Sequence, residues 1–115
     1  MYKILFFKDK HGREPIKDYL TELASKNDKN SRANLKKISE YISILAEFGT
    51  YVGEPIVKHL DGDIWELRPM RNRILFAAWE GDKFVLLHMF VKKTQKTPKR
   101  EIETAKRNFE NYKQT

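Results

Sequence analysis

The sequence predicts an α+β protein, with a twisted antiparallel sheet, an amino-terminal helical hairpin on one face and a carboxyl-terminal helix. Two observations carry this prediction. In the first half of the chain, apolar residues recur every three or four positions in two segments, which is the period of an amphipathic helix. The second half instead consists of short strand-like runs separated by tight turns. The 115 residues are an ordinary size for one domain, and we expect residues 1–115 to form a single one.

The first half is expected to contain one strand followed by two helices. Residues 2–7 (YKILFF) combine β-branched and aromatic side chains, which is typical of a strand. A helix is predicted to begin just before Pro15, since proline fits the first turn of a helix. A second helix is predicted over residues 31–48, and Gly49 is well placed to end it. The polar residues 25–31 join the two helices into a hairpin that lies on the sheet.

The second half is expected to supply most of the sheet. Four strand-like runs follow one another: 56–60, 63–69, 73–79 and 83–91. Their connections are short enough for hairpins, so consecutive strands must be antiparallel. Residues 84–91 are apolar at nearly every position, which indicates a central strand covered on both faces. Residues 98–112 are predicted to form a final helix packed at the end of the sheet, with Thr97 as N-cap and Pro98 at its first position.

The composition argues against several classes of function. The chain has no cysteine, so it can form neither a disulfide nor a thiolate metal site. Its three histidines are scattered and lack clustered carboxylates, and no glycine-rich phosphate loop or dinucleotide motif is present. We therefore expect no metal and no cofactor. The apolar run near the amino terminus is only four residues long, too short for a signal peptide, so we expect a cytoplasmic protein.

Positive charge is the first indication of function. The chain carries 23 lysines and arginines against 16 aspartates and glutamates, a net charge of +7, which favours polyanionic partners. Arg68 closes one predicted strand and Arg73 opens the next. Seven cations lie between residues 92 and 107: Lys92, Lys93, Lys96, Lys99, Arg100, Lys106 and Arg107. If the strands are neighbours, several cations converge at one end of the sheet, where they could bind a phosphodiester and stabilise the charge of its cleavage.

The same pattern is compatible with a nucleic-acid surface that has no catalytic activity, or with ordinary solvated strand ends. His59 is expected to be an ordinary surface residue in preference to an RNA contact, and His88 a core residue in preference to a catalytic base. Tyr51 and Tyr112 could stack on a nucleobase. Three aromatic residues are expected in the core rather than as stacking platforms: Trp65, Trp79 and Phe90. RNA carries its own nucleophile, the 2′-hydroxyl, so cleavage without a metal requires only positioning and proton transfer.

Three segments together resemble the RelE/ParE toxin superfamily, in particular its HigB-like, phage-derived branch. They are KHLDGDIWELRP (58–69), RILFAAW (73–79) and LLHMFVKKTQKTPKREIETAKR (86–107). The branch is typified by a Leu-Trp-Glu-Leu-Arg strand, an arginine opening the next strand, and a Phe-x-Lys-Lys-Thr-x-Lys-Thr-Pro segment that enters a helix. The element order resembles the superfamily over essentially the whole chain. One departure is Met89, which stands where a glycine is common.

The resemblance implies a RelE-like fold and the toxin of a type II toxin–antitoxin system, a ribosome-dependent, metal-independent endoribonuclease that cleaves mRNA and inhibits translation. The implied partners are mRNA on the ribosome and a HigA-like helix-turn-helix antitoxin, through which the toxin–antitoxin complex would bind operator DNA. Some superfamily members act on DNA gyrase instead, so a ParE-like, non-enzymatic inhibitor or binding module remains the alternative.

Residue roles follow from the same resemblance. Arg68 and Arg73 are implied to bind the scissile phosphate, and Lys93 to assist proton transfer. Three lysines are implied to bind the RNA: Lys58, Lys92 and Lys96. Because Arg68, Arg73 and Lys93 lie at or beside predicted strand ends, we expect their replacement to leave the core intact.

Overall fold

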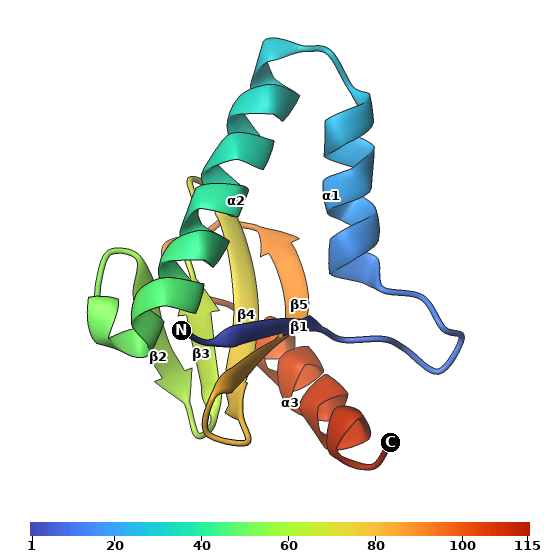
Figure 1. The fold of residues 1–115 in the computed structure, drawn as a ribbon, viewed down its shortest axis with the longest axis vertical. Coiled ribbons are helices and arrows are strands. Elements are labelled where there is room, and N and C mark those ends of the chain that lie inside the picture. The colour runs from blue at the N-terminus through green and yellow to red at the C-terminus, as the bar shows by residue number, and fades with distance from the viewer.

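The computed structural model describes residues 1–115 and confirms the predicted order of helices and strands (Figure 1). The elements are β1 (Lys3–Phe6), α1 (Pro15–Ser25), α2 (Lys29–Phe48), the short 3-10 helix η1 (Gly49–Val52), β2 (Val57–Asp61), β3 (Ile64–Leu67), β4 (Asn72–Trp79), β5 (Lys83–Val91) and α3 (Lys99–Lys113). The α+β class is as predicted, and the five strands form one twisted sheet of the RelE-like kind. None of the three helices has the length and apolar character needed to cross a membrane.

The sheet is antiparallel except at one edge. Its strand order is β1-β5-β4-β3-β2, and β1 runs parallel to β5, with Ile4 opposite Phe84. The expectation of a wholly antiparallel sheet is therefore wrong for β1. Tight turns fix the direction of β2 to β5, but no turn links β1 to β5, because both helices of the hairpin and three strands lie between them in the chain.

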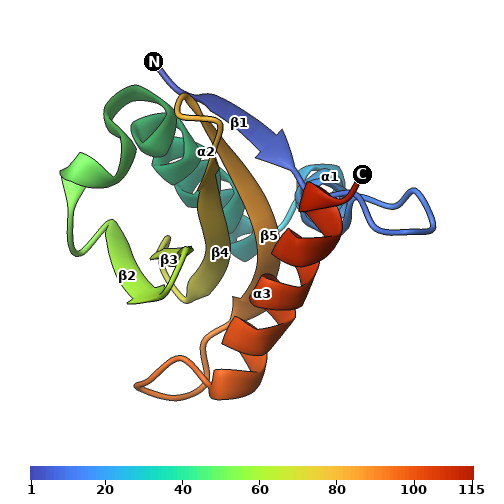
Figure 2. The same cartoon turned by 90° about the horizontal axis from the view of Figure 1, so that it is seen from below.

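Helices cover both faces of the sheet. On one face, Ile38 and Leu45 of α2 pack against Leu67, Ile74 and Phe76 of β3 and β4. On the other face, Ala105 and Phe109 of α3 pack against a second set of strand residues: Ile64, Leu75, Ala77, Val85 and Leu87. Figure 2 shows α2 and α3 on opposite sides of β4 and β5. The final helix was expected at the end of the sheet, but it covers the second face. Because β4 and β5 are apolar on both faces, each face needs a covering layer.

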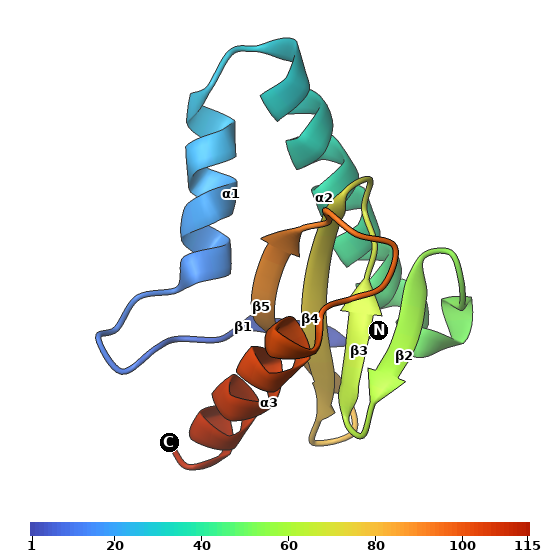
Figure 3. The same ribbon diagram turned by 180° about the vertical axis from the view of Figure 1, so that it is seen from behind.

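The ends of α2 and α3 show which capping predictions hold. Asp28 caps α2 by accepting a hydrogen bond from the Ser31 N–H at 2.9 Å, and Gly49 ends it with a φ of 65°. Thr97 does not cap α3. Pro98 occupies the N-cap position and makes no side-chain hydrogen bond there, while the Thr97 hydroxyl donates to the Glu66 carboxylate. The segment between β5 and α3 crosses the ends of β4 and β3 before it enters the helix (Figure 3).

Candidate functional site

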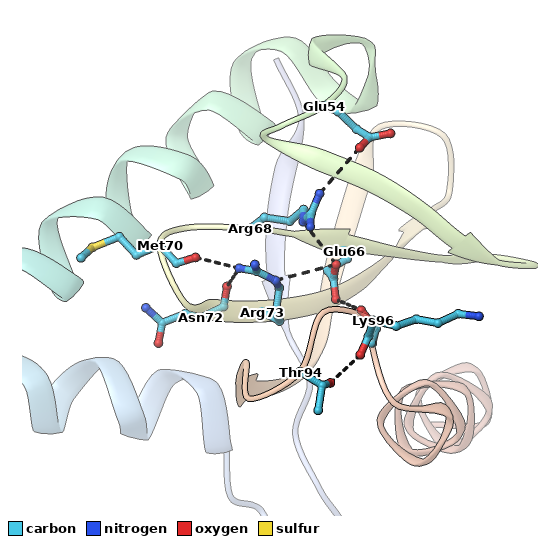
Figure 4. A network of polar contacts seen from close by, with 9 residues as sticks. Glu54, Glu66, Arg68, Met70, Asn72, Arg73, Thr94 and Lys96 are labelled. Carbon is cyan, nitrogen blue, oxygen red and sulfur yellow. Dashed lines mark hydrogen bonds and ion pairs between the residues drawn. The ribbon is translucent and has the colours of Figure 1, made fainter.

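The candidate site lies where β3 ends and β4 begins, beneath the segment that joins β5 to α3. Side chains alternate along a strand, so Glu66 and Arg68 point to the face that α3 covers. Arg73 lies opposite Phe90 in the β4–β5 register and points to the same face. Figure 4 shows both arginines beside the Glu66 carboxylate, each joined to it by a dashed line. Neighbouring strands therefore bring together the two arginines that the sequence predicted as a pair.

Glu66 is the centre of this arrangement. Its side chain is only 1% exposed. One carboxylate oxygen, Oε1, lies 3.5 Å from Nε of Arg68 and 3.9 Å from Nε of Arg73. The other oxygen, Oε2, accepts a hydrogen bond from the Thr97 hydroxyl at 2.6 Å. A buried carboxylate is stable only when it is paired and hydrogen-bonded, and Glu66 obtains its partners from β3, β4 and the segment before α3.

Arg73 is held rigidly. The residue is 6% exposed, and its Nη1 donates to the carbonyl oxygens of Met70 at 2.8 Å and Asn72 at 2.9 Å. Met70 has a φ of 58°, in the left-handed region that few residues other than glycine adopt, so this turn carries backbone strain. Burial lowers the pKa of Arg73 below its ordinary value; the charge of Glu66 opposes this shift and that of Arg68 adds to it. The guanidinium nevertheless stays charged at neutral pH.

Arg68 is bound more loosely than Arg73. Its side chain is 22% exposed, and Nη1 lies 3.6 Å from the carboxylate of Glu54, which is itself 64% exposed. Its Nε is buried and has no hydrogen-bond partner. The two ion-pair distances of Arg68 are longer than those of charged hydrogen bonds, so its guanidinium still has donors for an anionic ligand.

Lys93 lies on the rim of a cavity that contains Arg73. This cavity, called here the phosphate cavity, has a volume of about 430 Å³. Its lining is mostly cationic and polar: Met70, Arg71, Arg73, Lys92, Lys93, Thr94 and Gln95. The Lys92 N–H donates to the Arg71 carbonyl at 2.7 Å and Arg71 Nη2 donates to the Lys92 carbonyl at 3.0 Å, which fixes Lys93 beside the turn. The structure thus brings Arg68, Arg73 and Lys93 to one end of the sheet.

The three lysines expected to bind RNA lie around this site. Lys92 lines the phosphate cavity, and Lys96 is exposed in the segment before α3. Lys58 is exposed on β2, opposite Glu66 in the β2–β3 register, and therefore lies on the same face of the sheet. Lys58 and Lys96 thus add positive charge outside the phosphate cavity.

A comparison with protein-family models shows the family of the chain. Residues 19–110 match the family described as phage-derived protein Gp49-like (DUF891). The chain belongs to this family. The Gp49-like family is a RelE-like, toxin-related family, which agrees with the resemblance found in the sequence. No curated protein matches the chain.

The matched region of this Gp49-like chain includes every residue of the candidate site. It does not include a group of three or more histidine, cysteine, aspartate or glutamate side chains that could hold a metal ion, and no such group exists elsewhere in the structure. Two of the three scattered histidines have other partners. His88 Nε2 lies 2.7 Å from Oε1 of Glu101, and a ring nitrogen of His59 lies 2.7 Å from the Gly62 carbonyl.

One expectation from the sequence is wrong in this Gp49-like structure. Arg73 is buried and Arg68 is only partly exposed, so the expectation that their replacement would leave the core intact is wrong for these two residues. For Lys93, which is exposed, it stays a prediction. Sequence reasoning also missed Glu66. Its signal was the spacing in IWELR, where Ile64, Glu66 and Arg68 alternate onto one face and place an acid and a base two residues apart.

Proposed function

We propose that this Gp49-like protein is a HigB-like toxin of a type II toxin–antitoxin system, a metal-independent endoribonuclease that cleaves mRNA on the ribosome. The observation that carries this proposal is the pair of arginines held on one buried carboxylate, with Arg73 open to a cationic cavity. Preorganised donors of this kind stabilise the charge that develops on phosphorus during transesterification.

In the proposed reaction, a phosphate lies against Arg73 and Arg68. Nη1 of Arg73 is occupied by two carbonyls and Nε faces Glu66, so Nη2 is the nitrogen left for a phosphate oxygen. The 2′-hydroxyl gives its proton to water and its oxygen bonds to phosphorus, while the bond from phosphorus to the 5′-oxygen breaks. The ammonium of Lys93, at the rim of the phosphate cavity, donates a proton to the departing oxygen and regains one from solvent.

The surrounding lysines fit contacts with the RNA backbone. Lys92 carries positive charge in the phosphate cavity and Lys58 and Lys96 carry it outside the cavity, and contacts of this kind add affinity without reading sequence. The proposed inhibitor is a HigA-like helix-turn-helix antitoxin, and the complex of the two would bind operator DNA through the antitoxin. The proposed site of action is the cytoplasm, on translating ribosomes.

Expression and a purified translation reaction test this proposal together. Expressed alone in bacteria, the protein should arrest growth, and co-expression of an antitoxin encoded by a neighbouring gene should restore it. In a translation reaction, transcripts should be cut, whereas naked mRNA with a chelator should stay intact.

Three results would count against the proposed activity. Normal growth with folded, soluble protein present would refute the toxin. Cleavage of naked RNA only after a metal is added would refute the ribosome-dependent, metal-free chemistry. Growth arrest with intact transcripts would favour the non-enzymatic inhibitor of the same fold.

A further inference from the structure

A second hollow adjoins the phosphate cavity. It lies between the end of β5 and the start of α3 and has a volume of about 390 Å³. Lys93 and Thr94 line both spaces, so only this short segment separates them. An RNA strand with one phosphate against Arg73 would therefore hold a neighbouring nucleotide at the second hollow.

The lining of the second hollow differs in chemistry from that of the phosphate cavity. It combines the aromatic ring of Phe90 and the ring of Pro98 with the carboxylate of Glu101, and Lys93 and Arg100 stand around it. A carboxylate repels a phosphate, and the two rings offer it no hydrogen-bond donors, so this hollow suits the RNA backbone less well than the phosphate cavity does. A flat apolar surface beside hydrogen-bond acceptors suits a nucleobase, because single-stranded bases are bound by stacking and by hydrogen bonds to their edges.

Glu101 is held in one orientation. Its Oε1 lies 2.7 Å from Nε2 of His88, and its Oε2 lies 3.7 Å from Nε of Arg100. The His88 ring in turn stacks on Phe90, with ring centroids 6.1 Å apart. The Glu101 side chain is 18% exposed and lines the hollow, so part of its carboxylate is accessible to a ligand there. A fixed acceptor discriminates between ligands better than a mobile one, since a ligand without the matching donor leaves it unpaired.

We propose that this second hollow is a nucleobase subsite in which Glu101 selects guanine next to the cleaved phosphate. The proposal extends the proposed ribonuclease function, on which it rests for the direction of the RNA strand. A carboxylate offers only acceptors. Guanine presents two adjacent donors, N1–H and the N2 amino group, to such a partner. Adenine and cytosine present one amino group beside an acceptor nitrogen, and the single N–H of uracil lies between two carbonyl oxygens that the carboxylate repels.

Direct binding to short RNAs tests the subsite without any cleavage. The probes are oligouridines with non-cleavable 2′-deoxy backbones in which one central position carries guanine, adenine, cytosine, uracil or hypoxanthine. Wild-type protein should bind the guanine probe at least about fivefold more tightly than the uracil probe, as expected for a paired donor–acceptor edge. Hypoxanthine, which lacks the N2 amino group, should fall between them. This comparison needs no variant.

Two matched variants then assign the preference. Glu101→Gln can still accept a hydrogen bond from His88 but presents a donor to the hollow, and it should lose the preference for guanine. Glu103→Gln makes the same change at an exposed position on α3, and it should keep the preference. Thermal unfolding of both variants checks that they are folded.

The outcomes separate this proposal from the proposed function. Equal binding of all five probes, no binding of any, or an unchanged preference in folded Glu101→Gln would overturn the subsite, whatever the cleavage assays show. A guanine preference that depends on Glu101 in a protein that cuts no transcript would support the subsite and refute the ribonuclease.

Discussion

Glu66 lies at the end of β3 with one carboxylate oxygen shared by two arginines and the other bonded to Thr97. Taking such a carboxylate out of water costs several kcal/mol, which the surrounding partners must offset. The arrangement therefore makes each partner dependent on the others. Arg73 needs a counter-charge in its buried position, and the segment before α3 needs Thr97 to hold it against the sheet.

Neutralising Glu66 should destabilise the protein. Glu66→Gln preserves shape and the acceptor for Thr97 but leaves Arg73 and Arg68 without their shared counter-charge. We expect a loss of about 3 kcal/mol in the free energy of unfolding, near the lower end for a broken buried ion pair because Arg68 is partly exposed. Urea unfolding measures it. The control is Glu54→Gln, which removes the exposed partner of Arg68 and should cost no more than about 0.5 kcal/mol. Equal effects of the two substitutions would show that Glu66 is not the centre of the network.

The sequence located the residues of the site better than it described their surroundings. Arg68, Arg73 and Lys93 could be placed at one end of the sheet because each adjoins a strand end in a run of consecutive strands. The burial of Arg73 could not be read from its charge, since charged residues usually face water and only the covering segment removes this one from solvent. Thr97 was misplaced for a similar reason. Its position just before a helix suits an N-cap. Its hydroxyl instead donates to the buried carboxylate of Glu66 on β3, which needs a hydrogen-bond donor.

Among the helices and strands, the sequence predicted correctly those features that depend on local hydrophobic spacing and on short turns. The hairpin of α1 and α2 and the antiparallel order of β2 to β5 follow from helical spacing and short connections. The parallel pairing of β1 and the placement of α3 depend on packing between distant parts of the chain. The apolar seam of α3 at Ala105 and Phe109 indicates that one side is buried, but not which face of the sheet it covers.

An ion pair ties α3 to the end of β2, beside the turn between β2 and β3, and makes this contact depend on pH. The bond from Lys106 lowers the pKa of Asp61, and Asp61 raises the pKa of Lys106. Because the pKa of Asp61 is lower in the folded protein, its stabilising contribution is complete above about pH 4 and is lost as the pH falls through the lowered value. On the alkaline side, it is lost as the pH rises through the raised pKa of Lys106.

Asp61→Asn should therefore lower the melting temperature at pH 7 and low salt, and this effect should shrink at about pH 2, because Asp61 takes up a proton as the pH falls through its lowered pKa. Thermal unfolding at the two pH values measures this. Asp63→Asn, in the same turn, is exposed and makes no ion pair, so it should behave like the wild type at both. A gap between Asp61→Asn and the wild type that persists unchanged at the acidic pH would exclude the ion pair as its cause.

At the scale of the whole molecule, polar side chains enter the interior mainly at one place. Four polar or charged residues are buried, and three of them, Glu66, Asn72 and Arg73, lie at the turn between β3 and β4. Elsewhere the two helical layers bury apolar side chains on both faces of the sheet. The net charge of +7 attracts RNA in general, whereas the rigid arginine at this turn is the feature that could act on a phosphodiester.

Arg73 is proposed to act on the RNA phosphate, and the cleavage rate of Arg73→Lys tests this role directly. Lysine keeps the positive charge beside Glu66 but cannot make the two carbonyl bonds and still reach a phosphate. Arg107→Lys makes the same change on the exposed side of α3 and serves as the control.

The measurement is the rate of transcript cleavage by ribosome-bound protein, with ribosome binding and thermal unfolding determined for each variant. We expect that Arg73→Lys folds and binds ribosomes but cuts on the order of 100-fold more slowly than the wild type, while Arg107→Lys cuts normally. A folded, ribosome-bound Arg73→Lys that cuts at the wild-type rate would contradict this role.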